Sequence, residues 1–147
     1  MIKLIPVHKA YRYVELLYEI LQERTTDMSI SHLAVPTFAE HRKFVASDPY
    51  RHWYFAILDD RMRNNIVGTA YLTMNNEIGI QVRRDHQRQG YGRELLAKLL
   101  AEHKPLPAEP GVRQGQFVAN INPANEASIK LFTGLGAKLI QHTYRFD

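Results

Sequence analysis

The sequence contains no cysteine among its 147 residues. A chain without thiols forms no disulfide framework, has no thiolate nucleophile and holds no cysteine-ligated zinc. A domain of this length buries roughly 70% of the surface of its unfolded chain, so it needs no covalent cross-links to be stable. The absence of cysteine fits a reducing cytoplasm, and we expect the protein to be cytoplasmic.

Long hydrophobic runs are also missing. No uninterrupted apolar stretch approaches the ~20 residues that a helix needs to cross a bilayer, which argues against a membrane partner. Residues 1–6 are broken too soon by Lys3 and Pro6 to form a secretion signal. The seven histidines do not have the spacing of a zinc site, so we expect no metal.

The composition is that of an ordinary globular domain, and we expect a single domain over residues 1–147. Hydrophobic residues make up 45% and charged residues 23%, as in an average domain. The formal net charge of +4 suits either plain solubility or an anionic ligand such as a nucleotide or phosphate. The 19 lysines and arginines are scattered without a basic tract, which argues against nucleic acid.

Alternating apolar and polar residues predict four strands in the first part of the chain, in residues 2–7, 52–58, 66–74 and 77–83. Short polar turns separate the last three strands, at residues 59–65 and at Asn75 and Asn76, as is typical of an antiparallel meander. Two further strands are predicted nearer the C-terminus, in residues 116–121 and 138–146.

Four segments have apolar residues at the spacing of an amphipathic helix. They are residues 11–21, 37–47, 93–100 and 124–135. Thr37 is expected to cap the second helix, with Glu40 three residues later as its capping-box partner. Residues 24–36 and 103–111 lack any period and are expected to be loops. Strands mixed with helices in this order predict one α/β domain with a mixed sheet.

The turn between residues 83 and 93 has the properties of an anion site. Gly90 and Gly92 stand at the mouth of a predicted helix, whose first amide N–H groups have no partner and carry partial positive charge. Glycines let the backbone approach a phosphate closely, and Arg88 and Arg93 add full charges. The alternative is a purely structural glycine turn. No Gly-Lys-Ser/Thr follows, so the turn is not a P-loop.

The residues of this turn resemble a motif of a known protein family. The segment Gln87-Arg88-Gln89-Gly90-Tyr91-Gly92 matches the Q/R-x-x-G-x-G/A motif of the GNAT superfamily of N-acetyltransferases. A second block, from Asn122 to Phe132 and then Leu135-Gly136-Ala137, resembles the family's later motif. The resemblance is close over residues 66–137 and weaker before them. It implies a mixed, mostly antiparallel sheet flanked by helices, in which two parallel strands, here 77–83 and 116–121, splay around the cofactor.

The cofactor that the resemblance implies is acetyl-CoA, used as a co-substrate. One strand then offers backbone groups to the pantetheine arm, the glycine turn wraps the pyrophosphate, Asn125 hydrogen-bonds the arm, and Phe132 lies beside the thioester or is simply core. The residues implied in cofactor binding are Ile80, Gln81, Val82, Gln87, Arg88, Gln89, Gly90, Tyr91, Gly92, Arg93, Asn125 and Phe132.

The implied reaction is acetyl transfer to a primary amine by direct attack in a ternary complex. Glu77 matches the family's base, acting through a water; the alternative is a solvated turn residue. The acid–base pair of the ribosomal-protein alanine acetyltransferases is absent, because the matching positions hold Asn120 and Phe132, which neither accept nor donate the proton. Asn120 is left to orient a water or the acceptor. Tyr144 is an alternative acid, or a sheet tyrosine.

The segment 27–53 should cover the acceptor, because this part of the family fold lies over the thiol end of the cofactor. Its aromatic and cationic residues suit an apolar body with a phosphate or carboxylate, as in an amino sugar or sugar nucleotide. The alternatives are a protein N-terminal or lysine acetyltransferase, and a non-catalytic acyl-CoA-binding regulatory module. An open sheet edge at the final strand, residues 138–146, predicts a homodimer.

Overall fold

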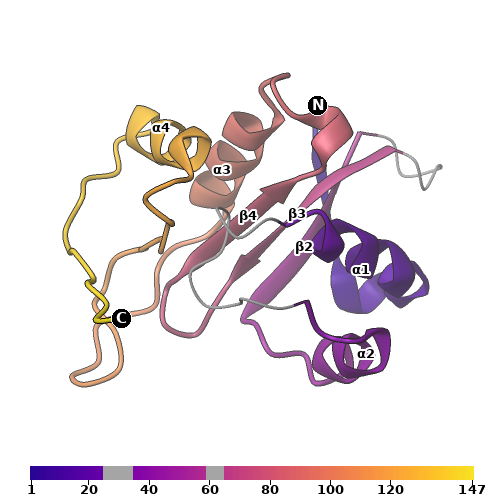
Figure 1. Cartoon of the computed structure of the whole chain (residues 1–147), viewed down its shortest axis with the longest axis horizontal. Coiled ribbons are helices and arrows are strands. Elements are labelled where there is room, and N and C mark those ends of the chain that lie inside the picture. The colour runs from indigo at the N-terminus through magenta and orange to yellow at the C-terminus, as the bar shows by residue number, and fades with distance from the viewer. Residues whose placement is uncertain (25–34, 59–64) are drawn as a thin grey trace.

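Four antiparallel strands form the sheet at the centre of the molecule (Figure 1). The computed structural model describes residues 1–24, 35–58 and 65–147. In this part of the chain the strands lie side by side in the order β1-β2-β3-β4. Their bounds are Lys3–Pro6, His52–Ile57, Ile66–Leu72 and Ile78–Val82. The four strands predicted before residue 84 are therefore confirmed, with ends that differ by at most two residues.

Helices cover both faces of the sheet, so the molecule has three layers (Figure 1). On one face lie α1, Val14–Gln22, and α2, Phe38–Ala46. On the other lie α3, Tyr91–Glu102, and α4, Glu126–Gly134. Short 3-10 turns occupy Val7–Lys9, Tyr11–Tyr13 and Arg84–His86. The segment predicted as one helix over residues 11–21 is thus a 3-10 turn followed by α1.

Two hydrophobic clusters hold the layers together, because successive side chains of a strand point to opposite faces. In β2, Phe55 and Ile57 are buried in the cluster beneath α1, whereas Ala56 belongs to the cluster beneath α3. Leu95 and Leu96 of α3 are each 1% exposed and fill that second cluster. Burial of such a side chain stabilises the fold by about 1.5–3 kcal/mol, so the two faces of β2 anchor both helical layers.

The cap of α2 is formed as predicted. Thr37 is the N-cap residue, and its Oγ1 accepts a hydrogen bond from the Glu40 N–H at 3.2 Å. The parts of the predicted loop 24–36 and turn 59–65 that fall in residues 25–34 and 59–64 lie outside the described residues, as do Ser29 and His32 of the predicted acceptor cover.

Two predicted strands near the C-terminus are wrong. In residues 116–121 only Val118 pairs, through one parallel bridge to Glu77. In residues 138–146 no strand forms. Alternation alone cannot predict a partner strand. The side chains of residues 138–146 are exposed to solvent, with Leu139 75% and Ile140 73% exposed. The homodimer expected from an open edge of that strand stays a prediction. No helix in the described ranges is both long and apolar enough to span a bilayer.

Candidate active site

The outer edge of β4 carries unpaired peptide groups. Next to β3, the Arg83 N–H donates to the Val67 carbonyl at 2.8 Å and the Thr73 N–H donates to the Glu77 carbonyl at 2.9 Å. Hydrogen-bonded positions alternate in an antiparallel pair, so the odd-numbered residues of β4 bond to β3. The even-numbered residues, among them Ile80, therefore turn their N–H and C=O groups toward the opposite edge.

One bridge closes the first part of that edge. The Ile78 N–H donates to the Val118 carbonyl at 2.8 Å, and the Val118 N–H donates to the Asn76 carbonyl at 2.9 Å. Beyond this bridge, no backbone hydrogen bond joins residues 119–121 to β4 within the described part of the chain. Two parallel segments thus meet at one end and separate, which leaves the Ile80 peptide groups available to an extended ligand, as in strand addition.

The three residues expected to face the cofactor arm do not behave alike. Ile80 and Val82 turn backbone groups to the open edge, although the Val82 carbonyl also accepts from Gln87 Nε2 at 3.2 Å. Gln81 occupies a position that bonds to β3. Its side chain is 5% exposed and donates to the Ile20 carbonyl of α1. The structure therefore places Gln81 in the contact between β4 and α1.

The open edge leads directly into the glycine-rich turn. Arg88 has φ 63° and Gly90 has φ 85°, both in the left-handed region. Only glycine adopts that region without strain, so Gly90 lets the chain reverse into α3. A Cβ at Gly92 would lie 3.3 Å from Leu131 Cδ2 and 3.6 Å from Val82 Cγ2. Gly92 therefore brings the start of α3 close to both β4 and α4.

The start of α3 presents free amide groups to solvent. Gly90 is the N-cap residue, without a side chain to cap the helix, and the first bond of the helix runs from the Glu94 N–H to the Gly90 carbonyl at 3.1 Å. The preceding N–H groups, at Tyr91, Gly92 and Arg93, have no partner within the described residues. Such groups and the helix dipole favour an anion at this point.

The side chains of the turn divide into two roles. Gln87 and Gln89 bond to the backbone, Gln87 to Val82 as above and Gln89 Nε2 to the Asp85 carbonyl at 3.4 Å. Arg88 and Arg93 are exposed and add positive charge beside the free amides. The two glutamines therefore shape the turn while the arginines are available to a ligand.

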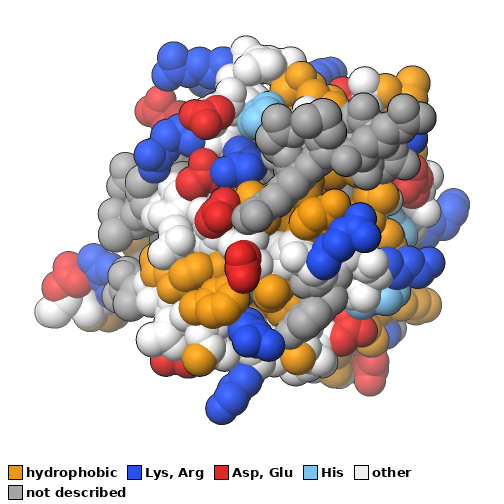
Figure 2. All heavy atoms as spheres, turned by 90° about the vertical axis from the view of Figure 1, so that its right-hand side faces the viewer, with side chains coloured by type: hydrophobic (Ala, Val, Ile, Leu, Met, Phe, Trp, Pro, Cys, Tyr) orange, Lys and Arg blue, Asp and Glu red, His pale blue; other side chains and the backbone are white. Residues whose placement is uncertain are grey.

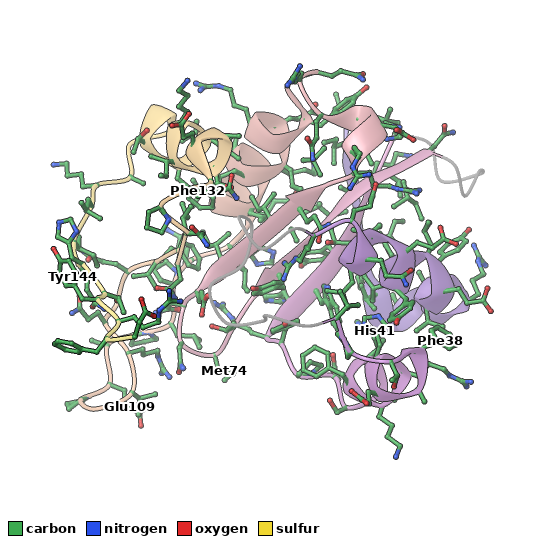
Figure 3. All side chains as sticks on the ribbon, in the orientation of Figure 1. Phe38, His41, Met74, Glu109, Phe132 and Tyr144 are labelled. Carbon is green, nitrogen blue, oxygen red and sulfur yellow. The ribbon has the colours of Figure 1, made fainter. Side chains whose placement is uncertain are left out.

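The two predicted cofactor residues of α4 have clear structural roles. Asn125 is the N-cap residue, and its Oδ1 accepts from the Ser128 N–H at 3.2 Å. Its Nδ2 donates to no group in the described ranges, so it is available to a ligand. Phe132 is 8% exposed and belongs to the hydrophobic cluster beneath α3 and α4 (Figure 3). This position acts as core.

Glu77 lies where the sheet ends and the two parallel segments meet. Its N–H donates to Thr73 Oγ1 at 3.0 Å, and its backbone forms the bridge to Val118. The side chain is half-buried and shares a sheet face with Tyr71, because both positions are odd-numbered in the paired register. The backbone of this carboxylate is therefore held from two sides.

Neither of the other two predicted catalytic residues has a described contact with Glu77. Asn120 follows the parallel bridge by two residues and is exposed. Tyr144 is 83% exposed on the C-terminal tail, with its ring 6.0 Å from that of His142. Figure 3 places Tyr144 well apart from Phe132 of α4. No described contact connects Tyr144 with Glu77.

Asn76 is a residue that the sequence analysis treated only as a turn. It is fully buried, at φ 64°. Its Nδ2 donates to the carbonyls of Leu106 and Gln114 at 2.9 and 2.8 Å, and its Oδ1 accepts from the Leu106 N–H at 2.7 Å. Asn76 thus ties the proline-rich loop after α3 to the residue just before Glu77.

Tyr50 belongs to the segment predicted to cover the acceptor, but its stacking on Tyr71 near Glu77 was missed. The rings of Tyr50 and Tyr71 lie 4.1 Å apart and are nearly parallel, at 6°. Burial raises the pKa of Tyr50 to about 12, with smaller contributions from Tyr71, Arg24 and Glu77. Burial also raises the pKa of Tyr71, which Arg24 opposes and Glu77 reinforces. The two residues come from separate segments, so no local pattern in the sequence predicts that their rings meet.

A family model described as the acetyltransferase (GNAT) family matches residues 14–137. No curated protein matches the chain. Among solved structures, an acetyltransferase from Thermus thermophilus is similar at 18% identity and a TM-score of 0.68, covering 96% of this chain and 89% of that one. Within the described ranges, no three metal-binding side chains of His, Asp or Glu gather in one place.

Two further structures have the same fold. The phosphinothricin acetyltransferase from Sinorhizobium meliloti, in complex with acetyl-CoA, is 18% identical with a TM-score of 0.58, over 92% of this chain and 73% of that one. Mutant forms of the spermidine/spermine N-acetyltransferase from Vibrio cholerae are 14% identical with a TM-score of 0.61, over 92% and 78%.

Proposed function

The chain belongs to the GNAT family of acetyltransferases, and from this premise we propose that it transfers an acetyl group from acetyl-CoA to a primary amine of a small molecule. The observation that carries the proposal is the continuity of the open β4 edge with the uncapped start of α3. An extended arm with amide groups that continues into a pyrophosphate fits both parts at once. The similar fold of an acetyl-CoA complex supports it.

The residues present fit this co-substrate. In this proposal the Ile80 peptide groups and the Val82 N–H bond the amides of the arm. The first amides of α3 hold the pyrophosphate together with Arg88 and Arg93, and Asn125 Nδ2 bonds the arm. When bound, acetyl-CoA supplies the thioester carbonyl that the amine attacks.

Glu77 is proposed as the base. An ammonium has no free electron pair, so the substrate nitrogen must lose a proton before it attacks. A half-buried carboxylate with its backbone held by Thr73 and Val118 is suited to receive that proton through a water. Asn120, exposed two residues after the bridge, is proposed to orient this water or the acceptor. The exposure of Tyr144 gives no support to its proposed role as an acid.

A second function is favoured by one observation. At the position where part of the family has a tyrosine that acts as general acid, this chain has Phe132, which is buried in the core. A protein that binds acyl-CoA without catalysing transfer would need no acid there. We also propose a cytoplasmic location. The proposed acceptor is a small amine such as an amino sugar, and the alternative acceptor is a protein N-terminus or a lysine.

The deciding experiment combines binding with turnover. Calorimetry measures acetyl-CoA affinity, and a thiol-release assay with mass spectrometry of the products follows transfer to a panel of small amines and peptides. We expect micromolar cofactor binding, of order 8 kcal/mol, and acetylation of at least one small amine. Binding with no transfer to any acceptor would support the non-catalytic function, and absence of binding would contradict both.

A further inference from the structure

Arg24 lies just after α1 and reaches across to the middle of β4. Its Nε donates to Gln81 Oε1 at 3.0 Å. Gln81 is in turn buried and donates from Nε2 to the Ile20 carbonyl. The amide therefore has a defined orientation, because its nitrogen is committed to α1 and its oxygen faces the guanidinium. Through these two hydrogen bonds the fold holds the positive charge of Arg24 at a fixed position beside the sheet.

No carboxylate neutralises this charge within the described residues. The neighbouring Arg83, by contrast, pairs with Glu19 at 3.9 Å and Glu23 at 3.7 Å. A guanidinium has five N–H donors in a planar fork that fits two oxygens of an acid. Gln81 accepts one of them and the Tyr71 hydroxyl another, and a half-buried cation without a counter-ion is costly. Within residues 1–24, 35–58 and 65–147 no acidic side chain pairs with the remaining N–H groups, and the acidic group of a ligand fits them.

Aromatic side chains form a wall next to Tyr50, one of the two tyrosines whose pKa Arg24 lowers. Trp53 meets the edge of Tyr50 at 4.8 Å between centroids, and Phe44 lies 5.8 Å from Trp53 and 5.7 Å from Tyr50. Phe44 is 43% exposed, so the wall reaches solvent. Figure 2, which views the molecule from the side of α1 and α2, shows hydrophobic side chains at the surface among charged ones. The wall suits the apolar part of a ligand.

Charges of opposite sign flank the tyrosine pair. Arg24 and Glu77 act on both Tyr50 and Tyr71, Arg24 lowering each tyrosine pKa and Glu77 raising it, after the larger effect of burial. A ligand resting on the pair therefore lies within reach of a cation and an anion together. A molecule with two or more ammonium groups and no acid would be repelled by Arg24.

We propose that the acceptor is an amine that also carries an acidic group, held by Arg24, with its apolar part against Tyr50 and Trp53 and its amine directed to Glu77. The inference rests on the proposed function, because Glu77 is the proposed base. It identifies Arg24 as the residue that determines acceptor specificity. The shared chemistry is an anionic oxygen group, either carboxylate or phosphate.

Matched acceptors test the inference. Phenylalanine and phenethylamine differ only in the carboxylate, phosphoethanolamine supplies a phosphate, and putrescine supplies a second ammonium. Hydrogen bonds to charged groups favour the acid-bearing acceptor by about 10–100-fold in kcat/KM, mainly through KM. A preference for phenylalanine or for phosphoethanolamine distinguishes carboxylate from phosphate. Equal rates for phenylalanine and phenethylamine together with low activity on phosphoethanolamine, or the highest rate on putrescine, would overturn the proposal.

The variant Arg24→Gln should remove the preference. Activity on the acid-bearing acceptor should fall by about 10–100-fold, activity on phenethylamine should change less than about threefold, and acetyl-CoA affinity should be unchanged. Arg24→Lys keeps the charge without the fork and should give an intermediate loss. Arg42→Gln, an exposed arginine of α2, is the matched control and should change neither. An equal loss on both acceptors in Arg24→Gln would contradict a specific role.

Direct binding separates this inference from the proposed function. Calorimetry with phenylalanine, phosphoethanolamine and phenethylamine, on protein saturated with coenzyme A, reports acceptor affinity without turnover. If no amine is acetylated, the proposed function fails, and a preference for an acidic ligand that disappears in Arg24→Gln still supports the inference. If neither acidic ligand binds more tightly than phenethylamine, the inference fails even when acetylation occurs.

Discussion

The ring of Tyr71 occupies the space that a side chain at position 79 would need. A Cβ at Gly79 would lie 2.0 Å from Cζ of Tyr71 and 2.5 Å from its hydroxyl oxygen. The two residues face each other across β3 and β4. The missing side chain lets the ring lie flat over β4, where it stacks on Tyr50. A glycine in the middle of a strand thus shapes the wall of the candidate acceptor site.

Gly79→Ala should displace the Tyr71 ring. Forcing a methyl group into occupied space costs about 1–3 kcal/mol, so the free energy of unfolding in urea should fall by that amount. Gly134→Ala is the control, because its Cβ would lie 3.5 Å from the flexible end of Arg93. The double variant Gly79→Ala/Tyr71→Ala should recover part of the packing loss. Wild-type stability in the single variant would disprove the steric argument.

Glu77→Gln tests the proposed base. The amide has nearly the same shape but takes up no proton, so kcat should fall by about 10²–10⁴-fold. Acetyl-CoA affinity should be unchanged, because the proposed cofactor contacts lie further along β4 and in the turn. Glu15→Gln, an exposed residue of α1, serves as control and should retain full activity. Full activity in Glu77→Gln would exclude the carboxylate from the reaction.

Substitutions at Gly92 should weaken cofactor binding in a graded manner. The alanine Cβ meets Leu131 at 3.3 Å and demands a small adjustment. The branched side chain of Gly92→Val adds two methyl groups at the start of α3, where the backbone must approach the pyrophosphate. We expect at least about a tenfold rise in Kd for acetyl-CoA in the valine variant, or 1.4 kcal/mol, and a smaller rise with alanine. Calorimetry that finds normal binding in Gly92→Val would count against the turn as the anion site.

Variants of Asn76 separate a side-chain effect from a backbone effect. Asn76→Gly accepts the positive φ but leaves the partly buried backbone groups of Leu106 and Gln114 without these partners, so the free energy of unfolding should fall by roughly 2–4 kcal/mol. Asn76→Ala adds a left-handed alanine and should cost about 1 kcal/mol more. Urea denaturation of both variants measures the two contributions. Equal stability of glycine and alanine variants would mean that the backbone conformation relaxes.

Stability should decrease in mild acid because of a histidine pair on the α3 side of the sheet. Burial lowers the pKa of both His52 and His103, with Arg51 adding to the effect and Glu102 opposing it at His103. Their rings lie 4.2 Å apart, and the Tyr54 hydroxyl lies 2.9 Å from His103 Nε2. These groups are neutral in the folded protein at pH values where the unfolded chain already binds protons.

The sign follows from that difference in proton binding. Between the folded pKa and the ordinary value of about 6.5, the unfolded state holds more protons, so the free energy of unfolding rises with pH. The stabilising contribution is complete above about pH 6.5 and is lost as the pH falls through the folded pKa. Urea unfolding from pH 8 to pH 5 should show this loss, and His52→Gln/His103→Gln should reduce it. Part of the loss of stability in acid should remain in this double variant, because burial also lowers the pKa of His41.

Within the described residues, the four strands before residue 84 and the four α-helices could be predicted from the sequence because local patterns determine them. The Thr37 cap and the alternation in β2 and β3 depend on neighbouring residues alone. Residues 138–146 have the same alternation, yet Phe146 is fully exposed. A strand needs a partner as well as a pattern, and residues 116–121 pair only at Val118. Long-range pairing was therefore the part that local reasoning could not supply.

The residues of the candidate site also differ in whether local sequence patterns could identify them. The glycine turn is contiguous, so its residues could be named from the sequence. Arg24, Tyr50 and Tyr71 come from three separate segments, and their meeting depends on strand register and on where α1 ends. Gln81 illustrates the difference: its place in the strand was predicted correctly, but its direction follows from the register set at Thr73 and Glu77.

The contacts of Asn76 have a consequence for biosynthesis. Its side-chain partners Leu106 and Gln114 lie 30 and 38 residues further along the chain. At ~5–20 residues per second, a ribosome makes the later partner roughly 2–8 s after Asn76. All four strands of the sheet have been translated by then, but the end of β4 that carries Glu77 still lacks its loop. A nascent chain stalled before residue 106 would therefore carry the strands of the sheet with an unfinished candidate site.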